Sequence, residues 1–305
     1  MSGLGEAPAF DRAPVPGGRV EQVSPLVRRL VAPNAGPFTF TGTCTYVVGR
    51  GRVAVIDPGP DDPGHLARLL DALRGETVGH ILVTHTHRDH SPGARALARA
   101  TGAPILGCAR HRRARPLEKG ETGALDASAD RDHRPDREMG EGDAVEGAGW
   151  RLEAVPTPGH TANHLAFALP GERALFSGDH VMAWSTTIVA PPDGAMGAYM
   201  ASLHRVLARE DRVYWPGHGG PVREPHRFVR ALIRHRQGRE AAILARLRAG
   251  DRTVPELVAS IYPDLAPALL AAAGLSVLAH LEDLVERSLV DPEGAPGLGA
   301  AYRPA

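Results

Sequence analysis

The sequence predicts an α+β fold in which two β-sheets pack face to face between outer helices, followed by a small helical domain. Two observations lead to this prediction. Short runs rich in β-branched and aromatic residues fill the first two thirds of the chain, with few helical segments between them. After Pro225 the apolar residues follow helical spacing instead. We therefore expect a larger domain over residues 1–224 and a helical domain with a tail over 225–305.

The strands expected in the larger domain are short, and an amphipathic helix is expected at about 65–74. Residues 1–24 are rich in Gly and Pro and read as a loose arm. Residues 111–149 are polar without clear periodicity and predict a long surface excursion, a kind of loop that is usually functional or mobile. The strands are expected at 44–48, 53–57, 80–83, 103–106, 150–155, 165–169, 174–176 and 212–215.

Three helices are expected in the C-terminal part. The first runs from about Phe228 to Gly250. Thr253, with Glu256 three residues later, predicts a capping box at the start of a second helix that ends near Ile261. Asp264 is the expected cap of a third helix that ends near residue 289. Three helices in about 60 residues are typical of a helix-turn-helix or winged-helix unit.

Composition excludes several classes of protein. The 305 residues carry 35 basic and 35 acidic side chains, so no net charge directs the chain to a nucleic acid or a membrane surface. Only Lys119 among the basic residues is lysine, so local arginine clusters reflect a general bias and are discounted. Cys44 and Cys108 are too few for a disulfide framework or a thiolate zinc site. With neither a secretory signal nor a membrane span in view, we expect a cytoplasmic protein.

Four residues of types that bind metals occur within six positions after the expected strand at 80–83. They are His85, His87, Asp89 and His90. Alternate residues of an extended segment point to the same side, so the first two imidazoles can share one ion. The carboxylate and the third imidazole suit a second ion beside it. A histidine-rich polar loop formed by chance is the weaker interpretation.

The same arrangement recurs at three further strand ends. His160, Asp179 and His218 each follow an expected strand and lie beside a Gly, which permits close backbone approach. A pattern repeated four times is more specific than any one motif. The sequence therefore predicts a metal centre built from loops at one end of the strands.

With these motifs, the sequence resembles the metallo-β-lactamase-fold hydrolase superfamily, from Asp57 in Ile56-Asp57-Pro58-Gly59 to His218. That resemblance implies a four-layer αβ/βα sandwich. The segment Gly42-Thr43-Cys44-Thr45-Tyr46 and the C-terminal helical unit resemble the subgroup typified by the mitochondrial β-lactamase-like endoribonuclease, which has a C-terminal winged-helix domain. The subgroup typically has Asn where this chain has Cys44.

The resemblance implies a role for each motif residue. His85, His87 and His160 would hold one divalent ion, and Asp89, His90 and His218 the other, while Asp179 would bridge the two. Zinc is expected, with manganese and iron as alternatives. Asp89 and Asp179 would also serve the catalytic step, in which a hydroxide shared by the ions attacks the substrate. Open coordination positions are typical of a catalytic site.

Residues around the expected centre have two interpretations each. Asp57 either accepts a hydrogen bond from a ligand histidine or is a turn residue before Pro58-Gly59. Trp184, Thr186 and Thr187 are candidates to line a substrate groove, and a packed loop is the equal alternative. The remaining histidines, His164 and His180 included, are expected to be packing or surface residues.

The substrate is not determined by the metal motif. Subgroup resemblance implies single-stranded RNA or another phosphodiester, and Arg223, Arg227, Arg230 and Arg234 share one helix face that could contact phosphates. A solvated face in an arginine-rich protein is the stronger interpretation of that row. The alternatives are a thioesterase or small-ester or lactone hydrolase and, further off, a non-catalytic metal-bound nucleic-acid-binding regulator. The expected partner is thus a small-molecule or RNA substrate, without membrane contact, and a homo-oligomer is compatible with the sequence.

Overall fold

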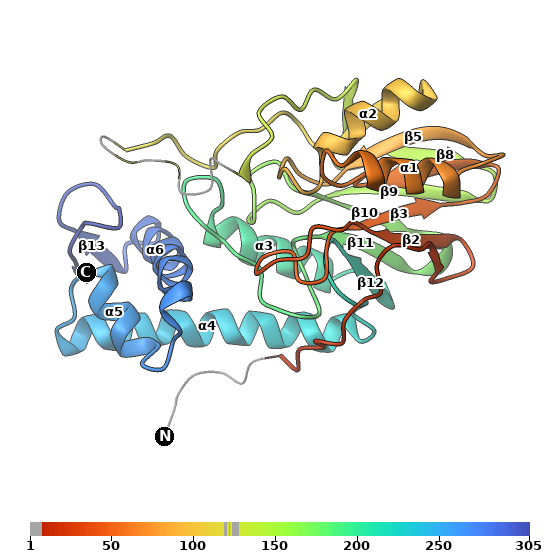
Figure 1. The fold of residues 1–305 in the computed structure, drawn as a ribbon. Helices are drawn as coiled ribbons and strands as arrows, with labels where there is room; N and C mark the ends of the chain where they lie inside the picture. Colours follow the sequence, from red (N-terminus) through yellow and green to blue (C-terminus); the bar gives the residue numbers. More distant parts are fainter. Residues whose placement is uncertain (1–7, 119–120, 122, 124–127) are drawn as a thin grey trace.

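The computed structural model describes all residues except 1–7, 119–120, 122 and 124–127. Two β-sheets pack face to face, and helices cover the outer face of each, which gives four layers (Figure 1). The predicted α+β sandwich is confirmed. The helical C-terminal unit lies to one side of it, at the blue end of the chain.

The first sheet has seven strands whose spatial order is also their order in the sequence. The pairings from β1 to β4 are antiparallel, and those from β4 to β7 are parallel. Its central strands are buried on both faces, because helices cover one face and the second sheet packs on the other. The strands are β1 (Glu21–Gln22), β2 (Val27–Val31), β3 (Cys44–Val48), β4 (Arg52–Ile56), β5 (Thr77–Val83), β6 (Ile105–Gly107) and β7 (Arg137–Glu138).

The second sheet has five strands in the order β12-β11-β10-β9-β8. All its neighbours are antiparallel except β11 and β12, which run parallel. Its inward side chains, such as Phe167 and Phe176, share one apolar core with the first sheet. The strands are β8 (Ala144–Gly147), β9 (Trp150–Pro156), β10 (Leu165–Leu169), β11 (Ala174–Gly178) and β12 (Val213–Pro216).

Helices α1 (Pro63–Ala72) and α2 (Pro92–Thr101) cover the first sheet, and α3 (Met196–Leu207) and α4 (Pro225–Ala249) cover the second (Figure 1). The start of α1 follows from its sequence, because the Asp62 side chain accepts a hydrogen bond from the backbone N–H of His65, and Pro63 fits the first helical position. Helix α3, whose Tyr199 and Leu203 pack against the second sheet, was not predicted from the sequence.

The C-terminal unit contains α5 (Val254–Ile261), a 3-10 turn (Pro267–Leu269), α6 (Leu270–Glu286) and a hairpin of β13 (Val290–Pro292) and β14 (Tyr302–Pro304). The predicted capping box of Thr253 and Glu256 opens α5. The predicted start of the third helix at Asp264 is wrong, because Pro267 opens the 3-10 turn first and α6 begins only at Leu270. That helix also ends at Glu286, before residue 289.

Helix α4 connects the two parts of the molecule. Its Val229, Leu232 and Ile233 pack into the core behind the second sheet, whereas Ile243 and Leu247 pack with α5 and α6. The proposed boundary between residues 224 and 225 stays a prediction. Among the helices of the described residues, none is long and apolar enough to cross a bilayer.

Two segments are more ordered than the sequence indicated. Residues 8–24 are not a loose arm: Val15 is buried, Phe10 packs edge-to-face on Phe228, and β1 joins the first sheet. The described part of 111–149 is not only a surface excursion, because it supplies β7 and β8. It also supplies Ala129, which forms a β-bridge with His87. Residues 1–7 and the middle of the excursion lie outside the described residues.

Candidate metal centre

The seven predicted ligand side chains meet at one end of the two sheets. The loop with His85, His87, Asp89 and His90 follows β5. The other three follow β9, β11 and β12: His160, Asp179 and His218. They form two neighbouring groups, and six of the seven are buried, while Asp89 is half-buried.

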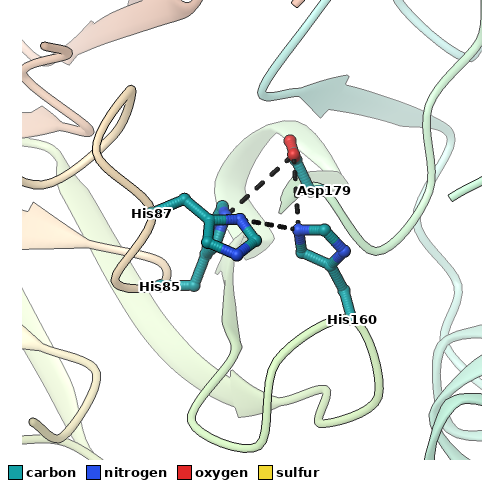
Figure 2. A group of neighbouring side chains, drawn as sticks. All are labelled: His85, His87, His160 and Asp179. Atoms are coloured by element: carbon teal, nitrogen blue, oxygen red, sulfur yellow. Dashed lines mark hydrogen bonds and ion pairs between the residues drawn. The ribbon is translucent and has the colours of Figure 1, made fainter. Parts of the chain in front are cut away.

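The first group contains His85, His87, His160 and Asp179, whose side chains converge in Figure 2. Nδ1 of His87 lies 3.0 Å from Nε2 of His85 and 3.0 Å from Nε2 of His160. Oδ2 of Asp179 lies 3.6 Å from Nε2 of His160 and 4.0 Å from Nε2 of His85. Four potential ligand atoms thus surround one point.

The second group contains Asp89, His90 and His218. Nε2 of His218 lies 3.2 Å from Nε2 of His90 and 3.1 Å from Oδ2 of Asp89. Asp179 lies between the groups: its Oδ1 is 3.5 Å from Nε2 of His90 and its Oδ2 is 3.5 Å from Nε2 of His218. One carboxylate therefore faces both sets of ligand atoms.

Hydrogen bonds at the far side of two ligand rings, His160 and His218, determine which of their nitrogens faces the centre. Nδ1 of His160 lies 2.6 Å from the carbonyl oxygen of Ile188, and Nδ1 of His218 lies 3.3 Å from that of Gly42. A carbonyl oxygen only accepts, so Nδ1 carries the proton in both rings. In the neutral form of each ring, the form that binds a metal, the lone pair of Nε2 therefore faces the centre. This arrangement is typical of histidines that bind metals.

The donor set fits a pair of divalent cations. Two ring nitrogens only 3.0 to 3.2 Å apart need a proton or a metal cation between them, because two bare lone pairs at that distance repel each other. Tetrahedral zinc with Zn–N bonds of about 2.0–2.1 Å separates its nitrogens by about 3.3 Å, which is close to the observed spacing. Oδ1 of Asp179 is also buried without a hydrogen-bond donor among the described residues.

Proton affinities in the metal-free chain differ between the groups. Burial lowers the pKa of His87 to about 3, so its ring is neutral, as a metal ligand must be. Burial by itself also favours the neutral ring of His218, but the carboxylates of Asp179 and Asp89 outweigh it and raise the pKa to about 9. A positive charge is thus favoured at the second group, and a cation can replace the proton there.

Comparison with known proteins agrees with this geometry. Residues 38–218 match the family model described as the metallo-beta-lactamase superfamily, a span that ends on His218. The chain belongs to the metallo-β-lactamase superfamily. Residues 253–298 match the model of the beta-lactamase associated winged helix domain. The endoribonuclease subgroup stays a prediction.

Three relatives show how far the similarity extends. A lactamase-like protein, adaB, from Aspergillus niger is 31% identical over 91% of this chain and 86% of its own length. An atrochrysone carboxyl ACP thioesterase from Aspergillus terreus is 33% identical over 80% of this chain and 73% of its own length. A metallo-beta-lactamase family protein from Thermus thermophilus is structurally similar, with a TM-score of 0.73, 25% identity and coverage of 93% of this chain and 100% of its own.

Asp57 lies directly behind the metallo-β-lactamase centre. Its carboxylate accepts hydrogen bonds from Nδ1 of His90 (2.9 Å), from the backbone N–H of Thr84 (2.8 Å) and from the Thr84 hydroxyl (2.7 Å). It therefore does more than form a turn: it fixes the ring of His90 and the start of the loop that carries His85. Its φ of 48° shows that the backbone adopts an unusual conformation there.

Sequence reasoning missed several residues that hold the ligands. The hydroxyl of Thr43 lies 3.4 Å from Oδ2 of Asp89. His164, expected as a packing or surface residue, is buried, and its Nε2 accepts the backbone N–H of Asp179 at 3.1 Å. The Gly-Thr pair at 42–43 was the available signal for the first contact.

Asp130 belongs to the excursion and holds the loop that carries the ligands. Its carboxylate accepts hydrogen bonds from the hydroxyl of Ser91 (2.7 Å) and from Arg95 (2.9 Å). Its backbone N–H donates to the carbonyl of Thr86 (2.7 Å), which lies between two ligand histidines. No local sequence signal marks this residue, since its partners lie about 40 positions away along the chain.

The three groove candidates differ in their surroundings. Trp184 is half-buried and its ring stacks on Phe40 at 5.0 Å, next to the Gly219 that follows a ligand histidine. Thr186 is also half-buried. Thr187 cannot line a groove, because it is buried and its hydroxyl donates to the carbonyl of Asp179.

Proposed function

We propose that this metallo-β-lactamase superfamily protein is a two-metal hydrolase that cleaves acyl thioesters to a carboxylate and a thiol. One observation carries the two-metal part: the carboxylate of Asp179 lies 3.5 Å from ligand nitrogens of His90 and His218 and 3.6 Å from that of His160. A single side chain that faces both groups supports two ions held close together.

The residues of the chain have distinct tasks in this reaction. Two divalent ions, when bound, would polarise the substrate carbonyl and supply an activated water. The buried histidines would hold the ions, and Asp179, which faces both groups, would contact both of them. Asp89 is the only partly exposed member of the seven, so we place the side from which substrate and water enter next to it.

Two properties of acyl thioesters suit this centre: a thiolate leaving group and an apolar acyl chain. A thiol has a pKa of about 8.5, so a thiolate departs with little need for protonation. Beside the second group, Phe40 and Trp184 stack to form an aromatic wall, and Phe38 is 60% exposed nearby in sequence. Such a wall favours an acyl or aromatic chain. Relatives that are about a third identical are named as thioesterases of acyl carrier protein.

A second candidate substrate is single-stranded RNA or another phosphodiester. It is favoured by Arg223, Arg227, Arg230 and Arg234, which are all exposed at or along α4. Three of these arginines line a hollow of about 540 Å³ between α4 and residues 8–11. The hollow contains none of the seven metal-group residues, so RNA would have to span from there to the centre.

One activity panel tests the proposal. The purified protein is assayed with acyl-thioester, lactone and single-stranded RNA substrates, with and without chelator and after metal is restored. We expect chelator-sensitive thioester hydrolysis that returns with zinc, manganese or iron. RNA cleavage without thioester hydrolysis would replace the first candidate with the second. Activity on any substrate that survives complete metal removal would refute the two-metal mechanism.

A further inference from the structure

Arg236 is exceptional among the arginines of α4. It lies in the middle of the helix and is only 4% exposed, whereas Arg230 and Arg234 face solvent. Among the described residues no carboxylate forms an ion pair with it. A buried charge without such a partner is costly unless other groups compensate for the lost water. The groups around Arg236 therefore show what it does.

Arg236 contacts three segments that meet behind the metal centre. Its Nη2 donates a hydrogen bond to the carbonyl oxygen of Thr187 in the loop after β11. Its Nη1 donates to the hydroxyl of Ser276 in α6 at 3.3 Å. The guanidinium also lies over the ring of Tyr199 in α3, 5.3 Å from its centroid. The side chain thus joins the C-terminal unit, the outer helix layer and the loop.

The loop residues held by Arg236 in turn hold the first metal group. The hydroxyl of Thr187 lies 2.8 Å from the carbonyl oxygen of Asp179 and donates to it. The next residue, Ile188, accepts the Nδ1 proton of His160 over 2.6 Å. Residues 187 and 188 therefore contact two of the four members of that group, one through its backbone and one through its ring.

We propose that Arg236 is a positioning residue for the metal centre, through which the C-terminal unit supports the first group. It fixes the Thr187–Ile188 backbone, which keeps the carbonyl of Ile188 in place for His160 and the Thr187 hydroxyl in place for Asp179. Helix α4 supplies no metal ligand, yet it determines how well the ligands are oriented. The inference rests on the two-metal part of the proposed function and is independent of the substrate.

The contacts predict unequal effects on the two groups. The contacts that hold the other five ligands do not involve residues 187 and 188; these ligands are His85, His87, Asp89, His90 and His218. Loss of Arg236 should therefore weaken the first group, which depends on His160 and Asp179, more than the second. Loss of outer hydrogen-bond partners typically lowers metal affinity by about 10- to 100-fold, and Arg236 acts through one further residue, so about tenfold is expected.

The test compares Arg236→Gln and Arg236→Lys with the matched control Arg234→Gln, which removes an exposed arginine from the same helix. Metal affinity and stoichiometry are measured by competition with a chromophoric chelator. Cobalt spectra report the ligand field of each occupied site. We expect Arg236→Gln to bind one ion normally and the other about tenfold more weakly. Arg236→Lys should retain most of the affinity because it can still donate to the Thr187 carbonyl, and the control should be unchanged.

A purely structural role predicts a different result. In that case Arg236→Gln would unfold at lower temperature but bind two ions with wild-type affinities, and this outcome would overturn the proposal. If Arg236→Gln does not fold, Thr187→Val is tested in its place, because it removes only the hydroxyl that donates to the backbone carbonyls of Asp179 and His180. Unchanged affinity at both sites of Thr187→Val would then overturn the proposal, and weaker binding of the ions that Asp179 faces would support it. Neither outcome depends on thioester activity, so the inference and the substrate assignment can fail separately.

Discussion

Oδ2 of Asp57 lies 2.9 Å from Nδ1 of His90, so the carboxylate decides which ring nitrogen of His90 faces the second metal group. Asp57→Ala should lower metal affinity or activity by about 10- to 100-fold, because the ring of His90 would lose its fixed orientation. Chelator competition on the folded variant measures the loss. Affinity within about twofold of the wild type, well short of that range, would show that packing alone orients the ring.

The Asp179 carboxylate faces ligand nitrogens of both groups, so its removal should affect both ions. We expect Asp179→Ala to lose turnover and lower metal occupancy, with the circular dichroism spectrum retained because the strands of the core lie elsewhere. Elemental analysis and a thermal melt check this. Near-normal activity in Asp179→Ala would contradict the prediction that Asp179 bridges the two ions.

Metal content tests the pair of groups directly. Protein purified without chelator should contain close to two equivalents of zinc, or of manganese or iron, per chain. Elemental analysis after gel filtration gives the number. A value well below one that does not rise on supplementation is incompatible with the centre described here.

Metal uptake should depend on pH through the second group. Asp179 and Asp89 raise the pKa of His218 to about 9 in the metal-free chain, so this ring is protonated at neutral pH. A metal must displace that proton, so its apparent affinity should rise with pH up to about 9 and fall as the pH drops. Titration of metal-free protein in a weakly buffered solution with a pH indicator should show proton release on binding. Uptake without proton release would contradict the sign of this effect.

The exposed arginines of α4 distinguish the two candidate substrates. If the substrate is RNA, neutralising Arg227, Arg230 and Arg234 together should weaken binding. The slope of log binding constant against log salt concentration should also become shallower, by about 0.7 for each lost phosphate contact. For a small acyl thioester, KM should stay nearly unchanged. Arg248→Gln, which removes an exposed arginine at the far end of the helix, is the control. RNA cleavage that is insensitive to the triple variant would show that this face is only solvated.

Ligand types and strand ends could be predicted from the sequence because both are local patterns. The run from His85 to His90 follows one predicted strand, and His160, Asp179 and His218 each follow another. Sequence alone indicated that loops at one end of a sandwich would bring them together. The capping box at Thr253 was also predictable, since both of its partners lie within four residues.

The remaining features depend on partners far apart in the chain. β2 was missed because its Val-Arg-Arg-Leu-Val pattern does not alternate, yet Arg28 and Arg29 are buried beside Glu76 and Glu21. α3 was missed although Tyr199 and Leu203 have helical spacing, because Gly and Pro precede it closely. Thr43, Asp130 and Arg236 support the centre only through tertiary contacts.

Because of the β-bridge between His87 and Ala129, insertions and deletions should be tolerated less at this end of the 111–149 excursion than in the part before it. Arg88 donates its backbone N–H to the carbonyl of Ser128 at 2.7 Å, and Asp130 donates its own to Thr86 at the same distance, so the two backbones run together beside the ligands. In amide hydrogen exchange these two N–H groups should be among the slowest in any loop. Over evolutionary time, insertions and deletions in this family should accumulate before residue 128 and stop there, since a shift of one residue would misalign the bridge.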